Sequence, residues 1–304
     1  MRRLIKIIIL SSAVLLLIVI LVGIASVFYV LVPYPNKKVH EILEENRVQI
    51  QSFDGITLVG EIKRNQTDSH HWAVLVHSYR TDHTTMYNFG NFYTANGWHV
   101  LYPDNRAHGN SGGHFIGMGY LDRLDLLAWV RYILSMDSDA EIVLHGLSMG
   151  ASAALMFSGL SDEEVIHVKA IIADSGYASA ESYLTGKLYH RYNFPAFPII
   201  DIANVSFKIA AGYFMKDASA VEAVKQSCIP ILIIHGSQDQ SVSVNDAYLL
   251  FAEMKADKVL LIIQGAGHGK CQSVAPEKYW KEVNSFLNNS LCYDISMKKL
   301  QDKE

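Results

Sequence analysis

The sequence predicts an α/β fold with a mostly parallel central sheet, helices on both faces, a small helical insert and one N-terminal transmembrane helix. Short apolar runs alternate with helix-patterned segments along most of the chain, as they do when helices connect parallel strands. A long uncharged apolar run opens the chain, and an aromatic-rich stretch at about 176–217 interrupts the alternation. These three observations set the expected architecture.

The N-terminal run is long enough to cross a membrane. Residues 1–6 carry three basic side chains, and no charged residue occurs in residues 7–32. Since a helix needs about 20 apolar residues to span hydrocarbon, residues 7–32 are predicted to be a transmembrane signal anchor in the lipid bilayer. A cleaved signal peptide is the alternative, but the apolar run continues past the small residues Gly23-Ile24-Ala25.

The charges around this anchor predict its orientation. The basic residues before the span favour a cytoplasmic N-terminus and an extracytoplasmic catalytic domain on a single-pass protein of the cell membrane. Lys37 and Lys38, just beyond the span, argue against that orientation.

A linker at 33–47 is expected to lead into the folded domain, 48–288, which precedes a C-terminal tail at 289–304. The domain opens with a hairpin, because Val48–Phe53 alternates with period two and Asp54-Gly55 favours a tight turn before the returning strand Ile56–Ile62.

Continuous apolar runs of this length are typical of strands buried on both faces. They are Trp72–Val76, Val100–Tyr102, Ile142–Leu144, Val168–Ala173, Ile229–Ile234 and Val259–Ile263. The helix-patterned segments between and after them are about 84–95, 118–136, 148–159, 219–226, 244–255 and 276–288. The insert at about 176–217 is either a lid that forms an apolar substrate pocket or a helical subdomain packed on the core.

Composition limits the function classes. The 304 residues are 50% hydrophobic and 18% charged, with a net charge of −4, which suits a folded core and excludes a disordered chain. Charges of both signs are interspersed, so a nucleic-acid partner is not expected. Cys228, Cys271 and Cys292 form no C-x-x-C pair; three free thiols are favoured over a Cys271–Cys292 bridge, which spacing alone cannot decide.

The candidate nucleophile is Ser148. Gly146-Leu147-Ser148-Met149-Gly150 is a G-x-S-x-G pattern placed between an apolar strand and a helix-forming run. A sharp turn there exposes the serine hydroxyl above the sheet, and glycine fits where a larger side chain would clash. The alternative is a structural strand-to-helix turn with a capping serine.

A serine hydroxyl needs a base, and the base needs a group that orients it. Asp239 and His268 follow Ser148 in the expected order, each just after a predicted strand, where the sites of parallel sheets gather. His268 would take the Ser148 proton and Asp239 would hold the imidazole. Asp174 and Asp201 are competing acids, but they lie before or within the insert.

The expected oxyanion donors are the backbone N–H groups of Met149 and Tyr79, with Ser78 as a poorer candidate. The His77 side chain is expected to brace its loop rather than react. Asp104 and His108 are interpreted as parts of a structural loop. No ligand spacing or phosphate loop appears, so neither a metal nor a cofactor is expected.

Six segments carry a family resemblance: Leu75–Tyr79, Asp104–Ser111, Gly146–Gly150, Ala173–Tyr177, His235–Asp239 and Gly267-His268. Together they resemble the α/β-hydrolases, nearest to bacterial serine aminopeptidase-like and esterase-like hydrolases with one N-terminal membrane segment. The resemblance spans about 48–288 and implies the α/β-hydrolase fold and a Ser-Asp-His triad. Ser78 stands where the family usually has glycine in the oxyanion loop, which puts the oxyanion geometry in question. Ala107 also replaces a glycine usual in the family, in the Asp104–Ser111 loop, and is a mild change.

The resemblance leaves the substrate open, since the family includes enzymes for esters, thioesters, amides and peptides. The predicted function is hydrolysis of carboxylic esters of a small-molecule acyl substrate through an acyl-enzyme on Ser148. The alternatives are an amide or peptide hydrolase, a thioesterase, and a non-catalytic binding protein on the same fold.

Overall fold

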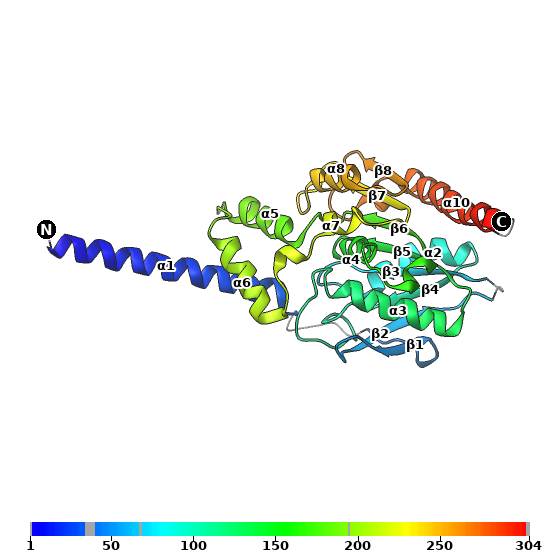
Figure 1. The fold of residues 1–304 in the computed structure, drawn as a ribbon, viewed down its shortest axis with the longest axis horizontal. Coiled ribbons are helices and arrows are strands. Elements are labelled where there is room, and N and C mark those ends of the chain that lie inside the picture. Colours follow the sequence, from blue (N-terminus) through cyan, green and yellow to red (C-terminus); the bar gives the residue numbers. More distant parts are fainter. Residues whose placement is uncertain (1, 34–39, 67–68, 194, 302–304) are drawn as a thin grey trace.

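The computed structural model describes residues 2–33, 40–66, 69–193 and 195–301. Its centre is an eight-stranded sheet in the order β1-β2-β4-β3-β5-β6-β7-β8 (Figure 1). The strands are β1 (Arg47–Gln51), β2 (Thr57–Lys63), β3 (His71–Val76), β4 (His99–Pro103), β5 (Glu141–Leu147), β6 (Val168–Asp174), β7 (Ile231–Gly236) and β8 (Lys258–Ile263). β1 and β2 pair antiparallel, as do β2 and β4, and the other pairs are parallel.

Helices cover both faces of this sheet. The α-helices of the described residues are α1 (Arg2–Leu31), α2 (Tyr87–Ala95), α3 (Asp122–Met136), α4 (Met149–Phe157), α5 (Ala180–Tyr192), α6 (Ile199–Ala211), α7 (Ala220–Val224), α8 (Val244–Glu253), α9 (Cys271–Val274) and α10 (Pro276–Gln301). Of these, α1, α5 and α6 lie beyond the sheet (Figure 1). Alternate residues of β3 face opposite sides: Val74 packs in the core with α3 and α4, whereas Leu75 packs in the core with α2 and α10. The predicted α/β architecture is confirmed.

Two helix boundaries differ from the sequence-based expectation by more than three residues. α3 begins at Asp122 rather than at 118, because Met118 (φ 48°) and Gly119 (φ 82°) adopt left-handed conformations that a right-handed helix cannot contain. α10 continues to Gln301, through most of the segment expected to be a tail. Cys228 and Cys271 are free thiols, and the Cys292 side chain lies outside the described residues.

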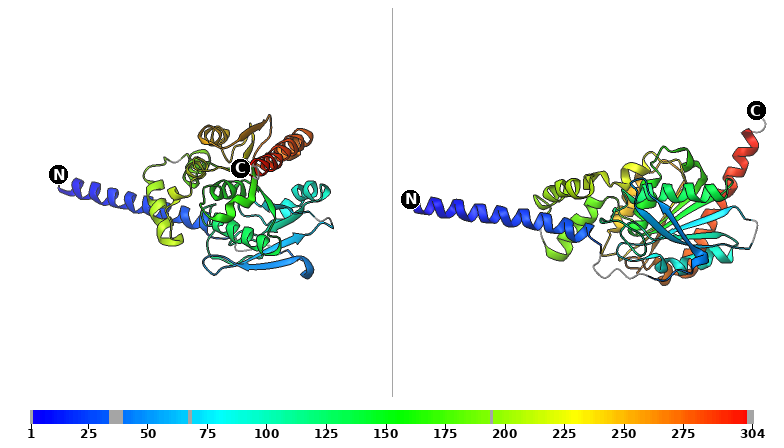
Figure 2. Two further views of the ribbon diagram at one scale, coloured as in Figure 1. Left: turned by 45° about the vertical axis from the view of Figure 1, so that its right-hand side comes forward. Right: turned by 90° about the horizontal axis from the view of Figure 1, so that it is seen from below.

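The insert forms α5, α6 and the short 3₁₀ turn Met215–Asp217. These helices lie beside the second half of α1 in all three ribbon views (Figures 1 and 2). The ring of Tyr183 on α5 meets the ring of Tyr79 edge-on, with centroids 6.4 Å apart. The insert therefore borders the loop after β3, at the carboxyl edge of the parallel strands.

Among the described residues, α1 is the one helix long and apolar enough to cross a membrane, and its most apolar stretch of 18 residues has a mean hydropathy of 3.2. Its first two-thirds project from the molecule, with the N-terminus far from the sheet (Figure 1). Its last turns are different, because Val27, Val30 and Leu31 are fully buried in the main core.

Candidate active site

Ser148 occupies the sharp turn between β5 and α4. Its backbone has φ 55° and ψ −113°, a conformation that a non-glycine residue adopts only at a cost of roughly 1–3 kcal/mol. Its N–H donates to the Asp174 carbonyl at 2.8 Å, which ties the turn to β6. The side chain thus stands above the carboxyl edge of the sheet, as the G-x-S-x-G pattern predicts.

The two glycines of that pattern make the turn sterically feasible. A Cβ on Gly146 would overlap the Gly150 carbonyl, and a Cβ on Gly150 would overlap the Val76 carbonyl. Both collisions are with backbone atoms, which have no rotamer to change. The pattern is therefore a steric requirement of bringing β3, β5 and α4 this close together.

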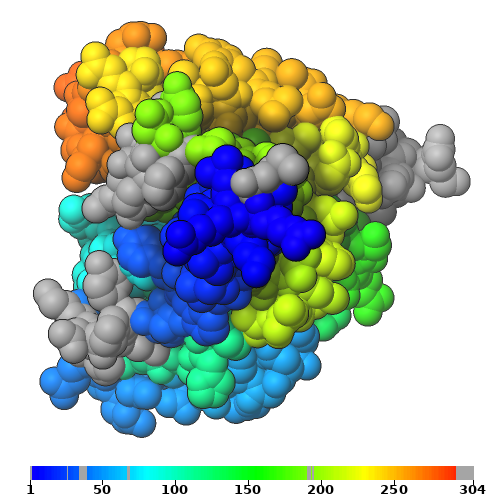
Figure 3. Space-filling model, turned by 90° about the vertical axis from the view of Figure 1, so that its left-hand side faces the viewer, coloured from blue at the N-terminus to red at the C-terminus, as the bar shows by residue number. Residues whose placement is uncertain are grey.

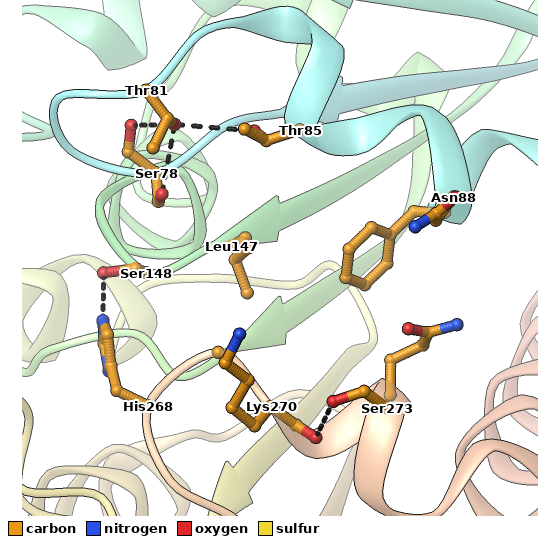
Figure 4. Close-up of a pocket in the computed structure, with 12 residues that line it drawn as sticks. Ser78, Thr81, Thr85, Asn88, Leu147, Ser148, His268, Lys270 and Ser273 are labelled. Carbon is orange, nitrogen blue, oxygen red and sulfur yellow. Dashed lines mark hydrogen bonds between the residues drawn. The ribbon is translucent and has the colours of Figure 1, made fainter.

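Ser148, His268 and Asp239 form one chain of hydrogen bonds. His268 Nε2 lies 2.8 Å from Ser148 Oγ (Figure 4), and His268 Nδ1 lies 2.6 Å from Asp239 Oδ2. β8 delivers the loop that carries His268, and β7 delivers the loop that carries Asp239. The Asp239 carboxylate is fully buried, whereas the imidazole is partly exposed.

The Asp239 carboxylate is held from several sides. Oδ1 accepts the backbone N–H groups of Ser241 and Val242 at 2.8 and 2.9 Å. Oδ2 also lies 3.3 Å from His235 Nε2. Burial alone would raise the pKa of Asp239, but the two imidazoles outweigh it and lower the pKa below its ordinary value. The residue is therefore ionised at neutral pH and positioned to accept the imidazole N–H.

His235 is a contributor that the sequence analysis missed. Its imidazole is fully buried, and although burial lowers its pKa, the interaction with Asp239 outweighs this and raises it. The sequence feature that could have indicated this role is its position at the end of β7, four residues before Asp239. Asp174, the competing acid nearest the turn, accepts instead from the Ser175 hydroxyl at 2.8 Å.

The loop after β3 carries the other half of the candidate site. His77 braces it, as expected: its Nδ1 lies 2.8 Å from the Ser78 carbonyl, and its Nε2 accepts the Asn105 N–H at 3.0 Å. Burial lowers the pKa of His77, so the ring is neutral. The Met149 N–H is in the first turn of α4, where backbone donors have no acceptor within the helix. Roles for Met149 and Tyr79 as oxyanion donors stay predictions.

The Asp104–Ser111 loop is a structural support, in agreement with its interpretation from sequence. Asp104 accepts from the His83 ring and backbone at 2.9 Å each, and His108 Nε2 accepts the Arg80 N–H at 3.0 Å. These bonds bind the loop after β4 to the loop after β3.

A pocket of about 370 Å³ opens beside Ser148 and His268. Figure 4 shows the Lys270 side chain reaching into it toward Leu147. The lining residues are Ser78, Thr81, Thr85, Asn88, Phe89, Leu147, Ser148, His268, Gly269, Lys270, Gln272 and Ser273. This lining combines hydroxyl and amide groups with one ammonium group and contains no carboxylate. Lys270 was not singled out by the sequence analysis, although it follows His268 by two residues.

Comparisons with known proteins agree with this architecture. Residues 84–292 match the sequence model of the prolyl oligopeptidase family. The chain is 30% identical over 196 residues to YqkD, an uncharacterized protein of Bacillus subtilis (strain 168). That match covers 64% of this chain and 63% of YqkD.

Solved structures share the fold at low sequence identity. The esterase Pf2001 of Pyrococcus furiosus superposes with a TM-score of 0.68 and 21% identity, covering 86% of this chain and 98% of that one. Est1E of Butyrivibrio proteoclasticus, solved with ferulic acid bound, has a TM-score of 0.62 and 18% identity, covering 81% and 99%. The acylaminoacyl peptidase of Pyrococcus horikoshii has a TM-score of 0.63 and 17% identity, covering 81% and 41%. The chain belongs to the prolyl oligopeptidase family, in the α/β-hydrolase superfamily of serine hydrolases.

Proposed function

We propose that this serine hydrolase cleaves carboxylic esters through an acyl-enzyme on Ser148. The observation that carries the proposal is the continuous hydrogen-bonded chain from Ser148 Oγ through the His268 ring to the buried Asp239 carboxylate. A nucleophile, a base and a group that orients the base, all within hydrogen-bond reach, are what acyl transfer requires.

The proposed reaction has two stages. Ser148 Oγ attacks the ester carbonyl carbon while His268 Nε2 accepts the hydroxyl proton, and the N–H groups of Met149 and Tyr79 stabilise the oxyanion. The carbon–oxygen bond then breaks, and His268 returns the proton to the departing alcohol. Water next attacks the acyl-enzyme, giving its proton to His268, which passes it back to Ser148 as the acid leaves.

The test compares full-length protein with Ser148→Ala on p-nitrophenyl esters from acetate to laurate. Loss of a triad nucleophile lowers turnover by about 10⁴–10⁶-fold, so we expect the variant to fall to background. Ser158→Ala is the matched control, because that buried hydroxyl lies just beyond α4 and donates to the Leu155 carbonyl. Equal activity of wild type and Ser148→Ala would refute the proposal.

A peptide or amide hydrolase is the second candidate, because the matching family model is that of the prolyl oligopeptidases. Peptidyl p-nitroanilides assayed beside p-nitrophenyl esters of the same acyl group separate the two. A faster ester reaction supports the ester proposal, and a preference for the anilide would replace it. Failure of the folded protein to react with a fluorophosphonate would favour a binding protein.

The pocket lining supports a polar substrate. Hydroxyl and amide groups solvate polar substituents, and the Lys270 ammonium attracts an anion. We therefore propose a preference for esters with a short polar or carboxylate-bearing group over long alkyl chains. α1 supports attachment to a membrane as a retained anchor, with the catalytic domain on the extracytoplasmic side.

A further inference from the structure

The C-terminal end of α1 is built into the catalytic domain. The last carbonyls of a helix have no N–H donors within it, and here the domain supplies donors for them. Tyr79 Oη donates to the Val30 carbonyl at 2.9 Å, the Arg80 guanidinium donates to the Tyr29 carbonyl, and the Ile116 N–H donates to the Leu31 carbonyl at 2.7 Å. Two of these donors belong to the loop that forms the candidate oxyanion site.

Packing against the domain also fixes the helix. Gly23 faces α6 so closely that an added Cβ would lie 2.6 Å from Ile202 Cγ2. Val27 and Val30 are 1% and 3% exposed. Seen from its N-terminal end, α1 lies against the α6 segment (Figure 3). Because α1 is held both at Gly23 and at its C-terminal end, it cannot rotate freely relative to the domain. The depth of α1 in a bilayer therefore sets the distance of the whole domain from the membrane.

The length of α1 gives that depth. Lys6 is the last charged residue before the apolar run, so its ammonium marks the inner edge of the hydrocarbon. Gly23 follows Lys6 by 17 positions, or about 25 Å of helix at 1.5 Å per residue, whereas the hydrocarbon is about 30 Å thick. The contact between Gly23 and α6 thus lies near the outer edge of the hydrocarbon. Any tilt of α1 moves this contact deeper into the hydrocarbon.

α6 and the turn before it expose apolar side chains at this level. Phe197 is 77% exposed, Ile209 82% and Val205 55%. α5 and α6 are also the parts of the domain that extend farthest toward the N-terminus of α1 (Figure 1). Asp201 and Lys208 are exposed on the same helix, which places α6 at the boundary between headgroups and hydrocarbon, where amphipathic helices bind.

We infer that the insert is a membrane-contacting element, with Phe197, Val205 and Ile209 in the outer leaflet of the bilayer that α1 spans. The inference rests on the proposed membrane anchor. Val30 lies about 10 Å beyond Gly23 along the helix, so Tyr79 and the adjoining loop lie at headgroup level. The catalytic centre is therefore held next to the membrane surface, where it meets esters carried by membrane-bound molecules.

The test uses two variants of the full chain, each with one tryptophan added at an exposed apolar position. Phe197→Trp reports on the insert. Ile166→Trp is the matched control, because Ile166 is 73% exposed but lies just before β6, at the amino ends of the parallel strands, whereas the insert lies at their carboxyl ends. Both variants and the parent are reconstituted into phosphatidylcholine–phosphatidylglycerol vesicles whose acyl chains are brominated near the headgroup.

The emission added by Phe197→Trp should be lost to quenching by the bromine atoms, while that added by Ile166→Trp should persist. Flotation with the vesicles is measured in parallel. A chain that floats but leaves Phe197→Trp unquenched contradicts the membrane-contacting insert and leaves the anchor standing. A chain that does not float contradicts the anchor and this inference together, without touching the proposed chemistry at Ser148.

Discussion

The two halves of the candidate site are held in different ways. The Ser148 turn is fixed by segments of the sheet itself, through close contacts among Gly146, Gly150 and the end of β3. The Tyr79 loop is braced within the domain by His77 and His108, but the side chains of Tyr79 and Arg80 also bind the last turn of α1, a helix outside the sheet. The position of the candidate nucleophile therefore depends on the sheet, whereas the geometry of the predicted oxyanion donor also depends on the docking of α1.

Among the variants that separate the two halves, the largest predicted effect is at Asp239, which follows β7 and belongs with the Ser148 turn. Asp239→Asn should lower kcat by about 10⁴-fold, since an amide can hold His268 in the wrong tautomer. Assay with a p-nitrophenyl ester measures it. Asp174→Asn is the matched control: Asp174 is buried next to the same turn but bonds Ser175 rather than His268. An equal loss in folded Asp174→Asn protein would mean that the acid has been assigned wrongly.

The second prediction tests the Tyr79 loop and its contact with α1. Gly23→Leu keeps α1 apolar but forces its side chain into Ile202, so the helix should separate from α6 and release the Tyr79 loop. Misplacement of a positioning group by about 1 Å can cost up to about 10²-fold, and we expect a loss of about 10-fold or more in kcat with membrane attachment intact.

Gly186→Leu is the control for that experiment. Gly186 lies in α5, and nothing is within 4 Å of an added Cβ, so this variant should retain wild-type kcat in the same vesicle assay. Wild-type activity in Gly23→Leu as well would show that the docking of α1 has no bearing on catalysis.

The third prediction concerns the pocket between the two halves. Lys270→Met should reduce the preference for a p-nitrophenyl hemisuccinate over the butyrate by about tenfold, the value of one hydrogen bond to a charged group. The butyrate rate should stay unchanged, because Lys270 is not part of the proton relay. An unchanged ratio would remove Lys270 from substrate selection.

The smallest predicted effect is on the free energy of unfolding, which should depend on pH through Asp239 but not through Tyr79. Because the pKa of Asp239 is lower in the folded chain than its ordinary value of 3.8, its ionised form contributes stability that is present above that value and lost as pH falls toward the folded pKa. Wild type should therefore lose about 1 kcal/mol more than Asp239→Asn between pH 7 and pH 3. Thermal unfolding from pH 7 down to pH 3 measures this difference.

Tyr79→Phe offers the comparison for that pH experiment. It removes the hydrogen bond to the Val30 carbonyl, which should cost about 1 kcal/mol at every pH. No charge is gained or lost with the hydroxyl in this range. A Tyr79→Phe effect that changed with pH as the Asp239 effect does would contradict this separation of the two halves.

The same difference between the Ser148 turn and the Tyr79 loop explains which features could be predicted from the sequence. The strands, the Ser148 turn, and the positions of Asp239 and His268 follow from local patterns, because each lies at the end of an apolar strand. The docking of α1 does not, since it depends on Gly23 meeting Ile202 and on Tyr79 meeting Val30, pairs far apart in the chain. His235 and Lys270 were overlooked because their roles arise from contacts and orientation, which spacing does not encode.

The most direct test of the central claim is labelling of the full-length protein with a fluorophosphonate, followed by mass spectrometry of the digested chain. The account predicts one adduct on Ser148, no adduct in Ser148→Ala, and slow labelling in Asp239→Asn. Labelling at another serine, or undiminished labelling of Ser148→Ala, would contradict the assignment of Ser148 as the nucleophile.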